Sequence, residues 1–115
     1  MSDLNSTLVK SSQVVGVNVT NVQDESLGKI EEIVLDKFTG QTKYVVLSFG
    51  GVLGLGEKLF ALPWKLLHYQ KEKDKFSVNL SKEKLKEAPG FSKDNWPNFI
   101  STEWQASIEG YYSNI

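Results

Sequence analysis

KIEEIVLDKFTGQTKYVVLSF, residues 29–49, is the stretch of sequence that decides the fold. Residues 29–36 and 41–49 are rich in Val, Ile, Leu and Tyr, and the segment between them ends in Gly40, which can take a positive φ. The stretch therefore predicts an antiparallel β-hairpin. Two adjacent glutamates, beginning at Glu31, interrupt the alternation of the first strand, so a β-bulge is expected there.

Further short β-strands are predicted on both sides of this hairpin. Residues 14–20 alternate apolar side chains with a period of two, and residues 59–64 form an apolar run that contains Pro63 near its end. Residues 66–70 and 76–80 flank a charged turn and predict a last hairpin. About six short strands with turn signals between them are typical of a small β-barrel or sandwich.

The C-terminal part of the chain changes to a helical period. Ser81 suits the N-cap of a helix over residues 82–88. Ser101 or Thr102 can cap a second helix over residues 103–112. Since the predicted strand over 41–49 is apolar on both faces, this helical tail is expected to cover its outer face.

These patterns predict a mainly β fold: a small β-barrel of about six strands with a short C-terminal helical extension. The expected organisation is a flexible N-terminal arm over residues 1–12, one barrel domain over residues 13–89, and a helical extension over residues 90–115 that packs on the barrel.

The composition excludes several functional classes. The net charge is −1 and the chain has no Arg, so it lacks both a global positive field and the bidentate fork that nucleic-acid sites favour. Without Cys, disulfides and thiolate metal sites cannot form. The first residues contain no apolar run, so we expect neither a secretory signal nor a membrane span, and we expect a cytoplasmic protein.

The order of motifs along the chain resembles the PRC-barrel family over residues 12–89. The motifs that carry the resemblance are Gly28-Lys29-Ile30, Leu35-Asp36, Thr39-Gly40, Tyr44-Val45-Val46, the glycine-rich loop 50–58, Phe60-Ala61-Leu62-Pro63-Trp64, and the segment 85–89. The resemblance implies a stand-alone small β-barrel that docks on a larger complex and has no shared set of catalytic residues. The family also includes a domain of a ribosome-maturation factor, which makes an RNA- or ribosome-associated processing factor the alternative function.

The glycine-rich loop over residues 50–58 does not fit a phosphate-binding loop. Such a loop needs Gly, Lys and Ser or Thr at the start of a helix, whereas here Gly56 is followed by the anionic Glu57 and Lys58 enters a strand. Its apolar residues form either an interaction patch or a plug at one end of the barrel, and both interpretations stay open. These residues are Val52, Leu53 and Leu55.

No catalytic or metal-binding set can be assembled from the sequence. His68 is the single histidine, and a hydrolytic or zinc site needs several partners around such a residue. The densest acidic group lacks the ligand spacing of a calcium loop, so a solvated hairpin edge is favoured over a cation site. This group comprises Asp24, Glu25, Glu31, Glu32 and Asp36. We therefore predict no enzyme activity, no cofactor and no metal.

The tail is rich in large aromatic residues, which dominate both cores and interfaces. They are Trp96, Phe99, Trp104, Tyr111 and Tyr112. Packing on the barrel is favoured over a dimer contact. The predicted function is a non-enzymatic protein-interaction and assembly module, expected to be a homodimer with a protein partner. Its candidate interaction surface comprises Val52, Leu53, Leu55, Trp64, Trp96 and Trp104.

Overall fold

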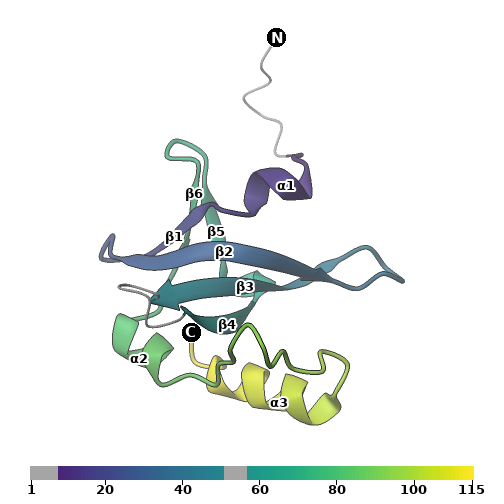
Figure 1. The fold of residues 1–115 in the computed structure, drawn as a ribbon. Coiled ribbons are helices and arrows are strands. Elements are labelled where there is room, and N and C mark those ends of the chain that lie inside the picture. Colours follow the sequence, from purple (N-terminus) through teal and green to yellow (C-terminus); the bar gives the residue numbers. More distant parts are fainter. Residues whose placement is uncertain (1–7, 51–56) are drawn as a thin grey trace.

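The computed structural model describes residues 8–50 and 57–115. In chain order the elements are α1 (Ser11–Val14), β1 (Asn18–Asn21), β2 (Ser26–Leu35), β3 (Thr42–Gly50), β4 (Glu57–Pro63), the 3-10 helix η2 (Trp64–Leu66), β5 (His68–Gln70), β6 (Lys75–Val78), α2 (Lys82–Lys86) and α3 (Thr102–Tyr111). The strands form one sheet of six in the order β4-β3-β2-β1-β6-β5 (Figure 1). Neighbouring strands are antiparallel except β1 and β6, which run parallel.

The predicted central hairpin is confirmed as β2 and β3. The pairing register shifts between Ile30 and Glu32, which leaves Glu31 as the extra residue of a bulge where the sequence predicts one. In the turn, Gly40 adopts a φ of 78° and its N–H donates to the Asp36 carbonyl at 2.7 Å. The Asp36 carboxylate accepts the N–H of Phe38 at 2.8 Å, which fixes the start of the turn.

The predicted strand over residues 14–20 is wrong at its N-terminal end. The short helix α1 ends at Val14, and strand β1 begins only at Asn18. The Gln13 side chain accepts the N–H of Lys10 at 2.8 Å, and Val14 enters the core. This local cap and the burial of Val14 outweigh the alternating pattern that predicted a longer strand. Helix α1 thus begins within the segment expected to be an arm.

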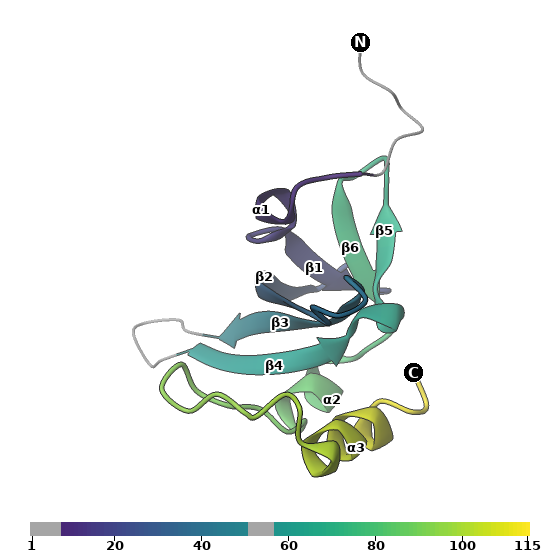
Figure 2. The same ribbon diagram turned by 90° about the vertical axis from the view of Figure 1, so that its right-hand side faces the viewer.

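The predicted fold class is confirmed as a mainly β fold with a six-stranded sheet and a short C-terminal helical extension, and the strongly curved sheet is not closed. Figure 2 shows β2, β3 and β4 as one wing and β1, β6 and β5 as a second wing at a steep angle to it. Strands β4 and β5 are the two edges. Pro63 ends β4, η2 then turns the chain into the three-residue strand β5, and β5 pairs with β6 and not with β4.

The C-terminal helices form as the capping signals predict. The Ser81 hydroxyl accepts the N–H of Lys84 at 3.0 Å at the start of α2, and the Ser101 hydroxyl accepts the N–H of Trp104 at 3.2 Å at the start of α3. Both helices lie below the β3–β4 wing, on the side away from β5 and β6 (Figure 2). The tail therefore lies against the outer face of this wing.

The segment between the two helices also covers one edge of the sheet. Phe91 exchanges two backbone hydrogen bonds with Leu59 of β4, at 2.8 and 2.9 Å. Since an unpaired strand edge invites association with another chain, this bridge protects part of β4. The hydroxyl of Tyr111 in α3 donates to the Lys84 carbonyl in α2 at 2.6 Å and ties the helices together.

One hydrophobic core links the sheet to the helical tail. Fully buried members include Ile30, Val45 and Phe60 from the sheet, with Leu85 and Ile108 from the helices. In the part of the chain that the structure describes, no helix is long and apolar enough to cross a membrane.

Candidate docking surface

Five aromatic rings form a continuous ladder along the outer face of the β3–β4 wing. The ring centroids of Phe91 and Trp96 are 5.0 Å apart, and Trp96 lies 6.2 Å from Phe99. Phe99 lies 5.2 Å from Trp104, which lies 5.2 Å from Tyr44 of β3. All four contacts are tilted or edge-to-face, which is the favourable geometry for such rings. The ladder therefore docks the tail on the sheet.

The outer side of the ladder borders a shallow groove of about 500 Å³ beside β2. The groove is lined by Glu32, Ile33, Val34, Leu35, Lys37, Trp96 and Phe99. We call Leu35, Phe38, Trp96, Phe99 and Ile100 the aromatic ledge. Phe38 and Ile100 directly follow the lining residues Lys37 and Phe99 in the chain.

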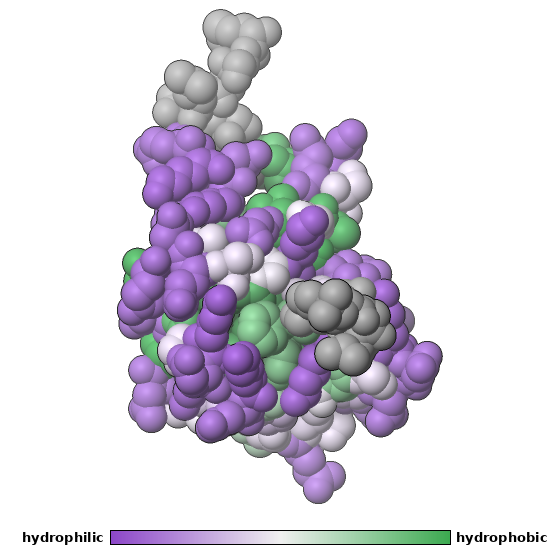
Figure 3. Space-filling model, turned by 60° about the vertical axis from the view of Figure 1, so that its left-hand side comes forward, coloured by the Kyte–Doolittle hydropathy of each residue, from purple (hydrophilic) through white to green (hydrophobic). Residues whose placement is uncertain are grey.

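Four members of the aromatic ledge leave much of their surface to solvent. The exposed fractions are 94% for Phe38, 81% for Ile100, 54% for Leu35 and 39% for Trp96. Single exposed apolar residues are normal on a protein surface, but several beside one groove are typical of an interaction site. The face that carries α2 and the β1–β2 turn is by contrast covered mainly by hydrophilic residues, with smaller hydrophobic areas between them (Figure 3).

The structure brings together only part of the predicted interaction surface. Trp96 and Trp104 both contact Phe99 in the ladder. Trp64 lies elsewhere, with its ring centroid 5.7 Å from that of Phe76 on β6. Residues Val52, Leu53 and Leu55 lie outside the described residues, so the choice between a patch and a plug stays a prediction.

Sequence reasoning missed the three aliphatic and aromatic residues that complete the ledge. Leu35 precedes the turn of the central hairpin, Phe38 lies within it, and Ile100 precedes the N-cap Ser101. Phe38 and Ile100 could have been noticed in the sequence as unusual apolar residues, because a turn or a helix start normally carries polar residues.

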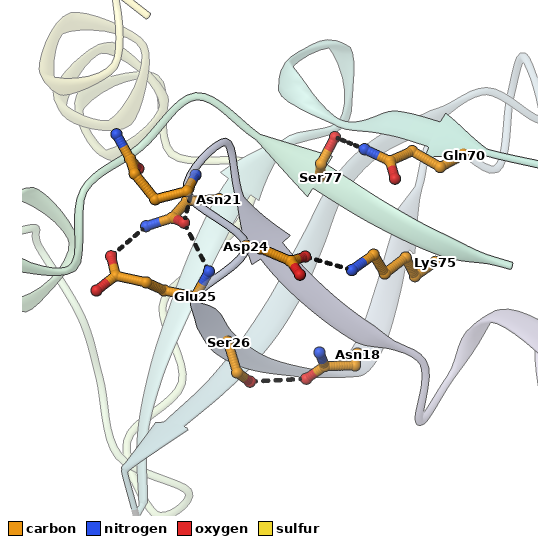
Figure 4. Close-up of polar contacts among 9 residues, drawn as sticks. Asn18, Asn21, Asp24, Glu25, Ser26, Gln70, Lys75 and Ser77 are labelled. Atoms are coloured by element: carbon orange, nitrogen blue, oxygen red, sulfur yellow. Dashed lines mark hydrogen bonds and ion pairs between the residues drawn. The ribbon is translucent and has the colours of Figure 1, made fainter. Parts of the chain in front are cut away.

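Two members of the predicted acidic group, Asp24 and Glu25, have partners within the fold (Figure 4). The Asp24 carboxylate accepts a hydrogen bond from Lys75 at 2.6 Å, and this contact is the main cause that lowers the pKa of Asp24. Glu25 accepts the side-chain amide of Asn21 at 2.8 Å. Over residues 8–50 and 57–115, no group of three or more potential ligands could hold a metal ion. Asp24 thus links the β1–β2 turn to β6, and Glu25 holds the turn to the end of β1.

Two other titratable groups lie where the tail meets the sheet. Burial raises the pKa of Tyr44, and the nearby Glu109 carboxylate raises it further. Glu109 also pairs with Lys65 at 3.1 Å, which links α3 to η2. Burial raises the pKa of Tyr112, whose hydroxyl has no hydrogen-bond partner among the described residues.

His68 is exposed on the edge strand β5.

Comparison with known proteins places this architecture in context. The family model described as PRC-barrel domain matches residues 7–85. Among solved structures, the chain is similar to one described as a 16S ribosomal RNA processing protein, RimM, from Pseudomonas aeruginosa, with 14% sequence identity and a TM-score of 0.44. The alignment covers 72% of this chain and 50% of that one, so this chain spans about half the length of that protein. Comparison with curated proteins gives no significant match.

Proposed function

Because the chain belongs to the PRC-barrel domain family, we propose that it is a non-enzymatic docking module that binds a partner protein through the aromatic ledge. The observation that carries this proposal is the groove that Leu35 and Trp96 line, together with the exposure of Phe38 and Ile100, each of which follows a lining residue in the chain. Aromatic residues at the centre of such surfaces supply most of the binding energy of protein interfaces. We infer a cytoplasmic setting for this interaction.

The charges around the groove define the partner. Glu32 and Lys37 line it with opposite signs, so their fields largely cancel. A partner segment that fits is apolar, with no strong net charge, and carries a few polar groups for the rim. This is the composition of an ordinary protein interface.

The same geometry disfavours RNA as the partner. Bases bind to aromatic rings by stacking on their faces, next to uncompensated basic residues. In the ladder, Trp96 and Phe99 pack against neighbouring rings, and Lys37, the one lysine that lines the groove, shares the lining with the acidic Glu32. Binding that depends on salt and on nuclease treatment is the signature that RNA would give.

The first test is affinity purification of the tagged protein from its own cells after nuclease treatment, with mass spectrometry of the bound proteins. We compare the wild type with the double variant Phe38→Ser/Ile100→Glu, whose exposed positions leave the core intact. The matched control is Val22→Glu, which changes an apolar residue with 64% exposure near the β1–β2 turn.

The expected result is an identified protein that binds the wild type and the control in stoichiometric amounts and is lost with the double variant. The purified pair should then show an affinity loss of about tenfold or more for the double variant, since each hot-spot residue contributes roughly 1 kcal/mol or more. A partner retained by the double variant, or lost on nuclease treatment, contradicts the proposal. Light scattering tests the predicted homodimer. If the wild type is a dimer and the double variant is a monomer, the aromatic ledge binds a second copy of this chain instead of another protein.

A further inference from the structure

A second hollow of about 490 Å³ lies between α1 and the β5–β6 hairpin, apart from the aromatic ledge. Figure 2 shows α1 on one side and β6 with β5 on the other, above the curve of the sheet. The hollow is lined by Val9, Gln13, Val14, Val17, Trp64, Tyr69, Lys71, Asp74 and Phe76. We call it the apolar hollow. Its volume lies within the range of about 300–1,000 Å³ that small-molecule sites occupy.

The walls of the apolar hollow are fixed by packing. Trp64 and Tyr69 both contact the buried ring of Phe76, with centroid distances of 5.7 and 5.3 Å. The Tyr69 hydroxyl donates to Asp74 at 2.8 Å, which holds the β5–β6 turn in place. Val14 and Val17 close the opposite wall from α1 and the segment after it. A site with rigid aromatic walls loses little entropy when a ligand binds.

The polar groups of the hollow are unbalanced toward hydrogen-bond donors. Two side chains of the lining accept hydrogen bonds within the fold: Asp74 accepts the Tyr69 hydroxyl through one carboxylate oxygen and keeps its negative charge, and the Gln13 carbonyl oxygen accepts the N–H of Lys10 at 2.8 Å. The Lys71 ammonium, the Gln13 amide nitrogen and the Trp64 indole nitrogen make no hydrogen bond to the described residues. Lys71 and Asp74 line the hollow with opposite charges, but the free donors outnumber the free acceptors. The complementary ligand group is therefore a hydrogen-bond acceptor, and a carboxylate can in addition pair with Lys71.

We propose that the apolar hollow binds a small amphipathic carboxylate, a molecule with an aliphatic or aromatic body and one carboxylate group. The body packs against Phe76, Tyr69 and the two valines, and the carboxylate meets Lys71 at the mouth. This site is independent of the aromatic ledge and of the proposed partner protein.

The test is an NMR titration of the full-length ¹⁵N-labelled protein, in which the shifts of the backbone amides and the indole N–H groups are measured. The three probes have the same eight-carbon alkyl chain and differ in head group. The probes are octanoate, 1-octanol and octylamine. The expected result is saturable shift changes at Val14, Val17 and the Trp64 indole, with octanoate binding most tightly and octylamine least. A carboxylate can accept hydrogen bonds from the free donors of the hollow, whereas an ammonium cannot, which accounts for this order.

Two lysine variants separate the head-group contact from general charge. Lys71→Ala should weaken octanoate about two- to fivefold, as expected for loss of one exposed ion pair, and leave 1-octanol unchanged. Lys73→Ala is the matched control, because Lys73 lies in the same turn and does not line the hollow. Val17→Phe should weaken all three probes by filling the hollow, with the melting temperature checked for each variant.

Several outcomes would overturn the proposal. They are the absence of saturable shifts with octanoate, shifts confined to other surfaces, octylamine binding as tightly as octanoate, and equal effects of Lys71→Ala and Lys73→Ala on octanoate. The wild-type titration and the variant Lys71→Ala test the site without a change in the core. The proposal can therefore still be tested if Val17→Phe folds poorly.

Discussion

At the scale of single residues, the fold depends on one close approach between two strands. Gly28 at the start of β2 adopts a φ of +126°, and a Cβ there would lie 2.0 Å from the Ser48 carbonyl oxygen of β3. No side-chain movement can relieve that contact, because the obstructing atom is backbone. The sequence shows a glycine at this point, but only the curvature of the sheet explains why the position requires one.

Gly28→Ala should therefore destabilise the protein by about 3 kcal/mol or more, since it combines backbone strain with a clash. Gly40→Ala is the matched control: its φ is also positive, at 78°, but a Cβ there meets nothing within 4 Å. Strain alone should cost about 1–2 kcal/mol. Urea unfolding of both variants gives the comparison. Equal losses would show that the β2–β3 approach relaxes at little cost.

At the scale of elements, two adjacent tyrosines of the tail differ in whether their hydroxyl groups have a hydrogen-bond partner. The Tyr111 hydroxyl donates to the Lys84 carbonyl of α2 at 2.6 Å. The neighbouring Tyr112 is only 2% exposed, and its hydroxyl is unpaired among the described residues. A buried hydroxyl without a partner retains its desolvation cost, whereas a paired one offsets it.

Tyr111→Phe should lower the free energy of unfolding by about 0.5–1.5 kcal/mol, the usual net value of one hydrogen bond. Tyr112→Phe should leave stability unchanged or raise it by about 1 kcal/mol, because it removes a buried polar group that has no partner. Thermal and urea unfolding of the two single variants measure both. A larger loss for Tyr112→Phe than for Tyr111→Phe would mean that the Tyr112 hydroxyl is satisfied in solution.

The elements also show how far sequence reasoning reaches. The bulge at Glu31, the turn at Gly40 and the caps at Ser81 and Ser101 follow from local chemistry, and the structure confirms each. The start of β1 did not follow, because burial of Val14 by distant residues decides it. Helical and extended conformations of such a short apolar segment differ little in intrinsic energy.

The candidate site was only partly predictable for the same reason. The aromatic content of the tail indicated Trp96 and Trp104, and local spacing placed Trp104 in a helix. That Leu35 lies in the same groove as Trp96 depends on how the tail crosses the sheet, which no local pattern encodes. The separation of Trp64 from the other tryptophans likewise depends on η2, which directs the chain toward β6.

At the scale of the whole molecule, the tail completes the folded unit. Deletion of residues 90–115 would uncover Tyr44 and Val46 on the outer face and leave the Leu59 backbone of β4 unpaired. Burial of each large apolar side chain of the tail, such as Ile108, contributes about 1.5–3 kcal/mol. Several such losses rival the total stability of about 5–15 kcal/mol for a domain.

We therefore expect the deletion to abolish cooperative thermal unfolding or to lower the melting temperature by more than about 15 °C. Ile100→Ser, at a position with 81% exposure, serves as the full-length control and should melt like the wild type. Calorimetry and circular dichroism report both. A truncated protein with an unchanged melting temperature would assign the aromatic ladder to an interface with another molecule.

The parallel pairing of β1 with β6 also has a kinetic consequence. Val19 pairs with Phe76, so the two strands meet only after the whole β2–β5 segment has been made. During synthesis, the β2–β3–β4 meander can form from near neighbours in the chain, whereas β1 must wait for its second partner to leave the ribosome. We expect the pairing of β1 with β6, and not the formation of a hairpin, to limit the folding rate, because closing this long loop costs the most conformational entropy.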